Sequence, residues 1–314
     1  MSGKATRQAF GESLARLGET HPEIIVMDAD LAKSTKSEIF AKKFPRRFFE
    51  MGISEANMIG AAAGMSFAGK LPFICSFGCF VTGRYDTLRV SVAYAQANIR
   101  IVGSHAGLGI GDDGHSQMGL EDIALMRALP TMGVFQPMDA RETELVMEYL
   151  VNEWKGPAYL RTTRQALPDF YPAGVPFRPG KLLELYSPSS GKLDVVCIAS
   201  GAGVAEAMQA SQALAGAGIK MGVWSAHCLK PYDDETTLSI ASQAKLMVTV
   251  EDHSVIGGLG SCVAEALAKT SIHPPLMKFG VQDVFGESGE PIELFEKHGF
   301  SARAIVQKIT QKLR

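Results

Sequence analysis

The sequence predicts an α/β protein of two domains, each a mainly parallel sheet with flanking helices. Three observations support this prediction. Short apolar runs alternate with helix-length segments along most of the 314 residues, as in strands joined by crossover helices. A Pro-rich stretch interrupts the alternation near the middle of the chain. The chain is 46% hydrophobic and 20% charged, which is sufficient for two sizeable cores.

The first series of elements predicts a domain over residues 1–170. Phe10, Leu14 and Leu17 fall on one face of a helix expected at 6–19. We expect the other elements of this series to be helices at 54–68 and 141–152, with strands at 24–27, 72–76, 100–103, 133–136 and 158–161.

The segment from Arg164 to Lys192 differs in character from the residues on either side. Its many prolines have a fixed φ angle and disfavour continuous regular structure. We therefore expect an interdomain linker at 171–190 that crosses the surface. The prolines are Pro168, Pro172, Pro176, Pro179 and Pro188.

A second β/α series predicts another domain over residues 191–314. Gly-rich turns at 200–203 and 257–260 precede two of its helices, but neither completes the Gly-x-Gly-x-x-Gly pattern of a dinucleotide site. We interpret both as helix entries without a ligand. The expected strands are 194–199, 219–224, 246–250 and 276–279, and the expected helices are 204–215, 233–243, 259–269 and 302–313.

Charge and composition narrow the classes of function. A formal net charge of −2 gives no reason to expect a nucleic acid or a membrane as partner. The N-terminus lacks the apolar core of a signal peptide, and no apolar run approaches the ~20 residues of a membrane span. The five cysteines form no Cys-x-x-Cys pair, so we expect buried thiols in a reducing cytoplasm.

Two segments of the first half combine residues suited to a planar ligand. Glu55 begins the helix expected at 54–68, and the small residues of that helix, Ala56, Gly60 and Gly64, would let a helix of another subunit approach closely. A glutamate there can also simply complement the helix dipole. Phe77 and Phe80 follow the strand at 72–76, where they could either face a heterocycle or belong to the core.

The segment 103–117 reads Gly-Ser-His-Ala-Gly-Leu-Gly-Ile-Gly-Asp-Asp-Gly-His-Ser-Gln. A run so rich in glycine, with two aspartates and two histidines, is incompatible with a core element. It predicts a polar loop that belongs to a functional site. The spacing of its histidines and acids matches no diagnostic metal site.

Three segments together resemble the transketolases, a thiamine diphosphate-dependent family. Gly-Ile-Ser-Glu-Ala-Asn-Met at 52–58 is similar to their cofactor-activating motif, and the 104–122 segment resembles their substrate loop. Val250-Glu251-Asp252-His253, followed by Gly257-Gly258-Leu259-Gly260, resembles the marker of their C-terminal domain. The match runs in order from about Ala5 to the C-terminus. The expected fold is therefore a pyrimidine-binding domain followed by a transketolase C-terminal domain.

The resemblance implies roles for individual residues in the transfer of a two-carbon ketol unit from a ketose phosphate to an aldose phosphate. Glu55 would activate the aminopyrimidine of the cofactor through a short charge-assisted hydrogen bond, and Phe77 and Phe80 would line its pocket. His105 would share in catalysis and in substrate binding. The other substrate-binding positions are Arg7, Ser34, Asp113, Gln117 and Arg164.

Some positions depart from the family pattern. Gln117 stands where many relatives carry histidine, and Asp112 stands where glutamate is usual. His115 has no clear counterpart, so its role stays open. The sequence also does not name the donor, because pentose phosphates and branched or sulfonated sugars all suit a cationic site.

The resemblance also implies a partner chain. In this family Mg²⁺ and the cofactor's diphosphate bind to a preceding domain that contains Gly-Asp-Gly, a tripeptide absent from this sequence. We therefore expect no metal ligands in this chain, an N-terminal transketolase subunit as partner, and an α2β2 assembly with twofold symmetry.

Three other interpretations remain. A beta subunit of a 2-oxo-acid dehydrogenase shares the two-domain layout, although Arg161-Thr-Thr-Arg164 and the His105 loop favour a transketolase. Half of a deoxyxylulose-phosphate synthase is the second. A non-catalytic partner-binding relic is the third, and the intact set of site residues argues against it.

Overall fold

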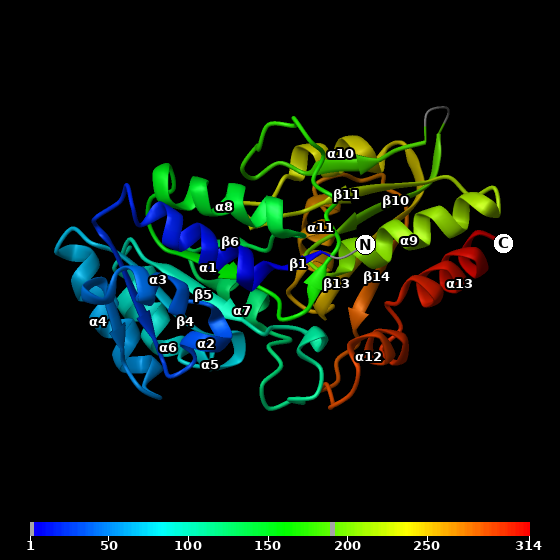
Figure 1. The fold of residues 1–314 in the computed structure, drawn as a ribbon. Helices are drawn as coiled ribbons and strands as arrows, with labels where there is room; N and C mark the ends of the chain where they lie inside the picture. The colour runs from blue at the N-terminus through cyan, green and yellow to red at the C-terminus, as the bar shows by residue number, and fades with distance from the viewer. Residues whose placement is uncertain (1–2, 189–191) are drawn as a thin grey trace.

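The structure is a computed structural model that describes residues 3–188 and 192–314. Two α/β bodies lie side by side (Figure 1), and helices α9 to α13 all belong to the second. The expected two-domain α/β architecture is confirmed. The boundary expected between residues 190 and 191 lies outside the described residues.

The first body is a seven-stranded sheet in the order β12-β6-β7-β5-β4-β2-β3. Every neighbouring pair is parallel except β12 with β6. The fully buried central strands are nearly all apolar, as expected for a parallel sheet covered on both faces. The strands are β2 (Ile24–Asp28), β3 (Phe48–Glu50), β4 (Leu71–Phe77), β5 (Arg100–Ser104), β6 (Gly133–Phe135), β7 (Ala158–Arg161) and β12 (Cys228–Lys230).

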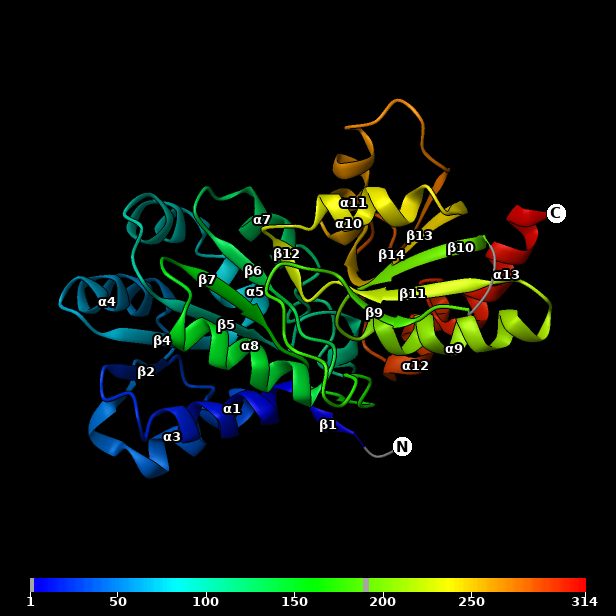
Figure 2. The same cartoon turned by 90° about the horizontal axis from the view of Figure 1, so that it is seen from above.

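Helices cover both faces of this sheet (Figure 2). Phe10 and Leu14 of α1 pack into the same core as Phe73 of β4, which is the face predicted from their spacing. Asp139 caps α8 by accepting a hydrogen bond from the Glu142 backbone. The helices are α1 (Thr6–Leu17), α2 (Ala32–Thr35), α3 (Glu38–Lys43), α4 (Glu55–Phe67), α5 (Gly78–Thr82), α6 (Tyr85–Thr87), α7 (Asp122–Ala128) and α8 (Ala140–Asn152), with short η segments at Pro45–Arg47, Leu88–Tyr94 and Leu108–Ile110.

The second body is a five-stranded sheet in the order β14-β13-β10-β11-β9, parallel except for β9 at its edge. Its strands are β9 (Leu183–Tyr186), β10 (Leu193–Ala199), β11 (Met221–Ser225), β13 (Ala244–Ser254) and β14 (Leu276–Val281). Its helices are α9 (Gly203–Gly216), α10 (Asp234–Ala241), α11 (Leu259–Leu267), α12 (Pro291–Lys297) and α13 (Ala302–Leu313).

Two elements depart from the sequence prediction. The expected linker at 171–190 contains β9, because the chain between Pro179 and Pro188 is free of proline and pairs antiparallel with β11. Strand β12 follows β11 in the second series, yet it pairs with β6 and so completes the sheet of the first body. A short antiparallel pair, β1 (Lys4–Ala5) with β8 (Ala166–Leu167), also joins the beginning and the end of that body.

All five cysteines are free thiols, as predicted, but Cys79 is only half-buried. Within the described ranges, no helix is long and apolar enough to cross a membrane. The same ranges contain no group of three or more His, Cys, Asp or Glu side chains arranged to hold a metal ion.

Candidate active site

The carboxyl edge of the first sheet brings most of the predicted site residues together. Phe77 ends β4, His105 follows β5 directly, and the short helix α2, which contains Ser34, begins soon after β2. Because these three strands are adjacent and parallel, their following loops leave the sheet at one edge.

Glu55 is the first residue of α4 and is only 4% exposed. The Nη2 atom of Arg84 lies 3.8 Å from its Oε2 atom, which is too long for a hydrogen bond. No hydrogen bond to this carboxylate exists among the described residues. Glu55 is therefore a buried carboxylate that still lacks a close donor, and such a group calls for one.

Helix α4 presents an unpartnered face beside Glu55. Ala56, Gly60 and Gly64 are exposed, and a Cβ atom placed on either glycine would meet no other atom within 4 Å. Ile53 next to this helix is 82% exposed. The small-residue face noted in the sequence is therefore open in the single chain.

Three aromatic rings form a stack at the end of β4. Phe77 and Phe80 lie with centroids 5.6 Å apart and planes at 16°. Phe77 also stacks on His105, with centroids 4.1 Å apart. Phe77 is buried and Phe80 half-buried, so the stack has one edge accessible to a ligand.

His105 is held by polar contacts on both ring nitrogens. Arg7 Nη1 lies 3.0 Å from Nε2, and Ser104 Oγ lies 2.8 Å from Nδ1. Since a guanidinium can only donate, Nε2 accepts and the neutral ring carries its proton on Nδ1. Burial, with the charges of Arg7, Arg164 and Lys36, lowers the pKa of His105 to about 3.

Arg7 links this histidine to the loop after β2. Its Nη1 atom also donates to the Ser34 carbonyl at 2.8 Å, whereas its Nε is buried and has no partner among the described residues. Asp28 at the end of β2 orders the loop by accepting hydrogen bonds from Thr35 and Ser37 at 2.7 and 2.8 Å. Burial raises the pKa of Asp28 to about 6.

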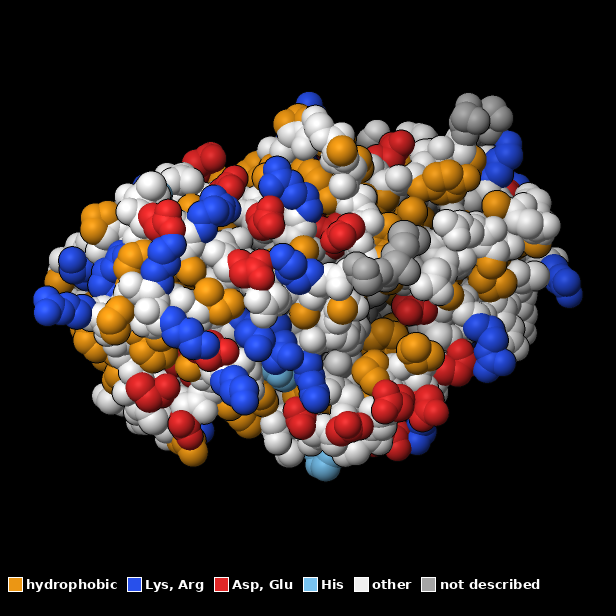
Figure 3. All heavy atoms as spheres, viewed as in Figure 1, with side chains coloured by type: hydrophobic (Ala, Val, Ile, Leu, Met, Phe, Trp, Pro, Cys, Tyr) orange, Lys and Arg blue, Asp and Glu red, His pale blue; other side chains and the backbone are white. Residues whose placement is uncertain are grey.

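The remaining predicted residues lie on or beside the loop after His105. Arg164 Nη1 donates to the Ile110 carbonyl at 2.8 Å and lies 3.4 Å from Asp113 Oδ2. Gln117 is half-buried, and its carbonyl accepts from the Cys79 thiol. Lys and Arg side chains gather near the middle of the face in Figure 3, where the two bodies meet.

A buried ionic cluster anchors the end of this loop. Asp122 accepts hydrogen bonds from Tyr159 at 2.6 Å and from Arg161 at 2.8 Å, and Arg161 also donates to the Gly119 carbonyl. The Arg161 charge is the main cause that lowers the pKa of Asp122 against its burial. Asp28 ends β2 and Asp122 begins α7, and no role was predicted for either residue.

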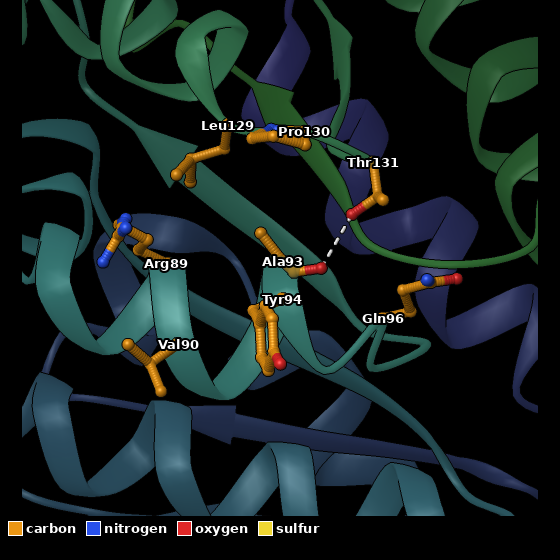
Figure 4. A pocket seen from close by; sticks show the side chains of 8 residues that line it. All are labelled: Arg89, Val90, Ala93, Tyr94, Gln96, Leu129, Pro130 and Thr131. Atoms are coloured by element: carbon orange, nitrogen blue, oxygen red, sulfur yellow. Dashed lines mark hydrogen bonds between the residues drawn. The ribbon is translucent and has the colours of Figure 1, made fainter.

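His115 lies apart from the aromatic stack. It is exposed, and its ring is 6.3 Å from that of Phe285 in the second body. A separate hollow of about 570 Å³ is lined by Arg89, Val90, Ala93, Tyr94, Gln96, Leu129, Pro130 and Thr131 (Figure 4), none of which is a predicted site residue.

Comparison with known families agrees with this arrangement. The model of the transketolase pyrimidine-binding domain matches residues 2–169, and that of the transketolase C-terminal domain matches residues 171–305. The chain belongs to the transketolase family. The pyrimidine-binding domain implies thiamine diphosphate as the cofactor.

Relatives of this transketolase-family chain fall into two size classes. It is 40% identical to the "Putative transketolase C-terminal section" of Methanocaldococcus jannaschii, covering 99% of this chain and 97% of that protein. It is 37% identical to the "6-deoxy-6-sulfo-D-fructose transketolase subunit SqwH" of Clostridium sp., covering 96% and 92%. Human transketolase is 36% identical over 97% of this chain, which spans only 48% of that enzyme.

Among solved structures, the "Split gene transketolase, inactive beta4 tetramer" superimposes with a TM-score of 0.87 at 41% identity. The match covers 99% of this chain and 98% of the other. The fold expected from the three sequence segments is thus that of the transketolase pyrimidine-binding and C-terminal domains.

Proposed function

We propose that this chain is the C-terminal subunit of a thiamine diphosphate-dependent transketolase. It would transfer a two-carbon ketol unit from a ketose phosphate to an aldose phosphate, and only when joined to an N-terminal partner chain. The observation that carries this proposal is Glu55, a buried carboxylate at a helix start whose nearest cation is 3.8 Å away.

The residues present fit the aminopyrimidine half of the cofactor. A ring nitrogen that carries a proton would give Glu55 the donor it lacks, and the low exposure of this carboxylate would strengthen that bond. Phe77 and the half-exposed Phe80 offer an apolar wall for the heterocycle, and α4 packs against both β4 and α5, which carry these rings. When bound, thiamine diphosphate supplies the nucleophilic carbon for the transfer.

The chain's own residues would then have three tasks. Glu55 holds a proton at N1′ of the aminopyrimidine. The neutral His105 accepts from Arg7 on Nε2 and is positioned by Ser104 on Nδ1, so a small change in its surroundings can redirect the Nε2 lone pair to a substrate hydroxyl. The aromatic rings exclude water from this centre.

The anionic end of the substrate would bind among Arg7, Ser34 and Arg164. The unpartnered Nε of Arg7 supports this role, because a buried donor without an acceptor favours an anion. A guanidinium fork suits either a phosphate or a sulfonate. Asp113 and Gln117 would bind hydroxyl groups of the donor, as their positions on the loop after His105 allow.

Two relatives of nearly the same length support the need for a partner, since their names give them as a section and a subunit of transketolases. The partner would supply the Mg²⁺ and diphosphate sites. The open face of α4 would form the twofold contact of an α2β2 assembly. We also propose the domain limits 1–170 and 191–314 with 171–190 between them.

The test is reconstitution. The highly purified chain should be folded and self-associated but inactive with thiamine diphosphate and Mg²⁺, and addition of the N-terminal chain should restore ketol transfer. Robust turnover by the single chain would refute the split-enzyme proposal. Oxidative decarboxylation of a 2-oxo acid by the mixture would favour the dehydrogenase, and formation of a deoxyxylulose phosphate would favour the synthase.

The donor can be identified with the same mixture. The Clostridium relative is named for a sulfonated ketose, so fructose 6-phosphate and its 6-deoxy-6-sulfo analogue should be compared at equal concentration. The ratio of their kcat/KM values would assign this chain to a phosphate- or a sulfonate-selective enzyme. Loss of both activities, with assembly intact, would favour the non-catalytic relic.

A further inference from the structure

The second body contacts the loop after His105 with one carboxylate. Asp252, in β13, accepts hydrogen bonds from the backbone amides of Leu108 at 2.7 Å and Gly109 at 3.1 Å. Asp252 is only 1% exposed. The contact joins residues 143 and 144 positions apart in the chain.

We propose that Asp252 is a positioning residue of the active site, which fixes the loop over 105–117 through these two amides. The second body would then support substrate binding through this loop, although none of the predicted catalytic residues lies in it.

The backbone around the contact is built for close approach. Gly107 has a φ of +89°, and a Cβ atom there would lie 2.2 Å from Asp252 Oδ2. Only glycine satisfies both conditions without displacement of the carboxylate. The loop is thereby pressed against Asp252 two residues after His105.

The loop beyond the contact also rests on the second body. Leu108 and Ile110 share a hydrophobic core with Leu294 and Phe295, and the Ser254 amide donates to the Leu120 carbonyl at 2.8 Å. Among the described residues, Asp252 is the one side chain of the second body that forms hydrogen bonds with the backbone of residues 105–117. Removing the charge of Asp252 should therefore weaken the hydrogen bonds of the loop backbone, while the apolar contacts of the Leu108 and Ile110 side chains remain.

Burial of Asp252 would be unfavourable without these amides. Burial raises its pKa, while the Arg161 charge and the two loop hydrogen bonds act in the opposite direction. A buried carboxylate is costly unless it is paired, so we expect Asp252 to have a role that a neutral side chain could not fulfil.

The neighbouring residue Glu251 provides a matched control. It is fully buried in the same strand and accepts two backbone hydrogen bonds, from Leu259 at 2.7 Å and Gly260 at 2.8 Å. Those amides begin α11, so Glu251 acts within the second body. These two hydrogen bonds satisfy backbone amides at the end of the Gly-rich turn at 257–260.

The experiment compares hydrogen–deuterium exchange, followed by mass spectrometry, in the wild-type chain, Asp252→Asn and Glu251→Gln. Each variant keeps one acceptor oxygen and presents an NH₂ group to the second amide. Asp252→Asn should accelerate exchange in the 105–117 peptide about ten- to a hundredfold while leaving 259–267 unchanged. Glu251→Gln should show the reverse pattern.

Unchanged exchange at 105–117 in Asp252→Asn would overturn the proposal, as would equal acceleration of both peptides by both variants. If Asp252→Asn does not fold, Gly107→Ala disturbs the same contact from the loop. Gly107→Ala should accelerate hydrogen exchange in the 105–117 peptide more than Gly111→Ala does. Gly111 has a similar φ of +80°, but the nearest atom to an added Cβ there is 3.3 Å away. Equal acceleration of exchange by the two substitutions would overturn the proposal that the Asp252 contact fixes the loop.

The consequence for turnover rests on the proposed function, whereas the exchange pattern does not. In the reconstituted enzyme, Asp252→Asn should raise the donor KM about tenfold or more, with a smaller fall in kcat, and Glu251→Gln should change neither. The expected exchange pattern with unaltered KM would mean that the loop does not bind the donor. That outcome would count against the proposed role of Asp252 in the site but leave the reconstitution result intact.

Discussion

The imidazole of His105 stacks on the ring of Phe77 with 4.1 Å between the centroids and 22° between the planes. Phe77 ends β4 and is paired with Ser104, the last residue of the neighbouring parallel strand β5, which His105 directly follows. His105 adopts a φ of +57° at this point, an uncommon value for a non-glycine residue. The stack thus joins a proposed cofactor-binding residue to a proposed substrate-binding one.

Glu55→Gln should nearly abolish turnover in the reconstituted complex while leaving the fold and assembly intact. Glutamine keeps the volume of the side chain but cannot stabilise a proton on the cofactor ring, a loss worth ~10²–10⁴-fold in rate. The measurement is exchange of the C2 proton of bound thiamine diphosphate by NMR, without any sugar.

Glu38→Gln is the matched control, because Glu38 also lies in the first turn of a helix but pairs with Lys42 near the surface. If Glu55 only complemented the helix dipole, both variants would lose about 0.3–1 kcal/mol of stability and keep their exchange rate. Exchange at the wild-type rate in Glu55→Gln would contradict the proposed role.

Arg164→Ala should reduce the use of phosphorylated donors more than that of hydroxypyruvate. The loss of one charge-assisted contact costs about 1.5–3 kcal/mol, or about ten- to a hundredfold in kcat/KM. Arg16→Ala is the control, since Arg16 is a surface arginine paired with Glu148. Equal losses for both donors would instead assign Arg164 to support of the loop through the Ile110 carbonyl.

Gly60→Leu should prevent self-association without unfolding the chain. A side chain at Gly60 meets nothing within 4 Å in the single chain, and leucine favours a helix over glycine by up to about 1 kcal/mol. Light scattering after gel filtration measures self-association, and thermal unfolding measures the stability of the fold. Gly216→Leu in α9, where a Cβ is equally unobstructed, makes the same change of helix propensity and should leave self-association unchanged. A dimer that survives Gly60→Leu would place the subunit contact elsewhere.

His105 should remain neutral over the physiological range. Its pKa is lowered to about 3 by burial first and then by Arg7, Arg164 and Lys36. Because the folded-state pKa lies below the unfolded value of 6.5, this group contributes stability above pH ~6.5 that is lost progressively as the pH falls towards ~3. NMR of ¹⁵N-labelled histidine should show no protonation of His105 between about pH 8 and about pH 5. A midpoint near its ordinary pKa would mean that the ring is more exposed than in this structure.

The elements with strong periodicity were predictable. The helix expected at 6–19 is observed at Thr6–Leu17, and the strand expected at 158–161 is observed at Ala158–Arg161. In contrast, the π-helical turn at Leu88–Tyr94 and the strand β12 were missed. A three-residue strand has too few positions to show a period, and its pairing with β6 is a contact between distant segments.

The sequence by itself determined the family, the two α/β domains and the identity of the candidate residues, because these depend on local patterns and on motifs in a fixed order. Only the tertiary structure decided that Glu55 is buried without a close donor, that Phe77 stacks with both Phe80 and His105, and that Asp252 of the second body bonds to the loop at Leu108 and Gly109. Burial and distance between remote segments follow from how the sheets pack, and no spacing along the chain encodes them.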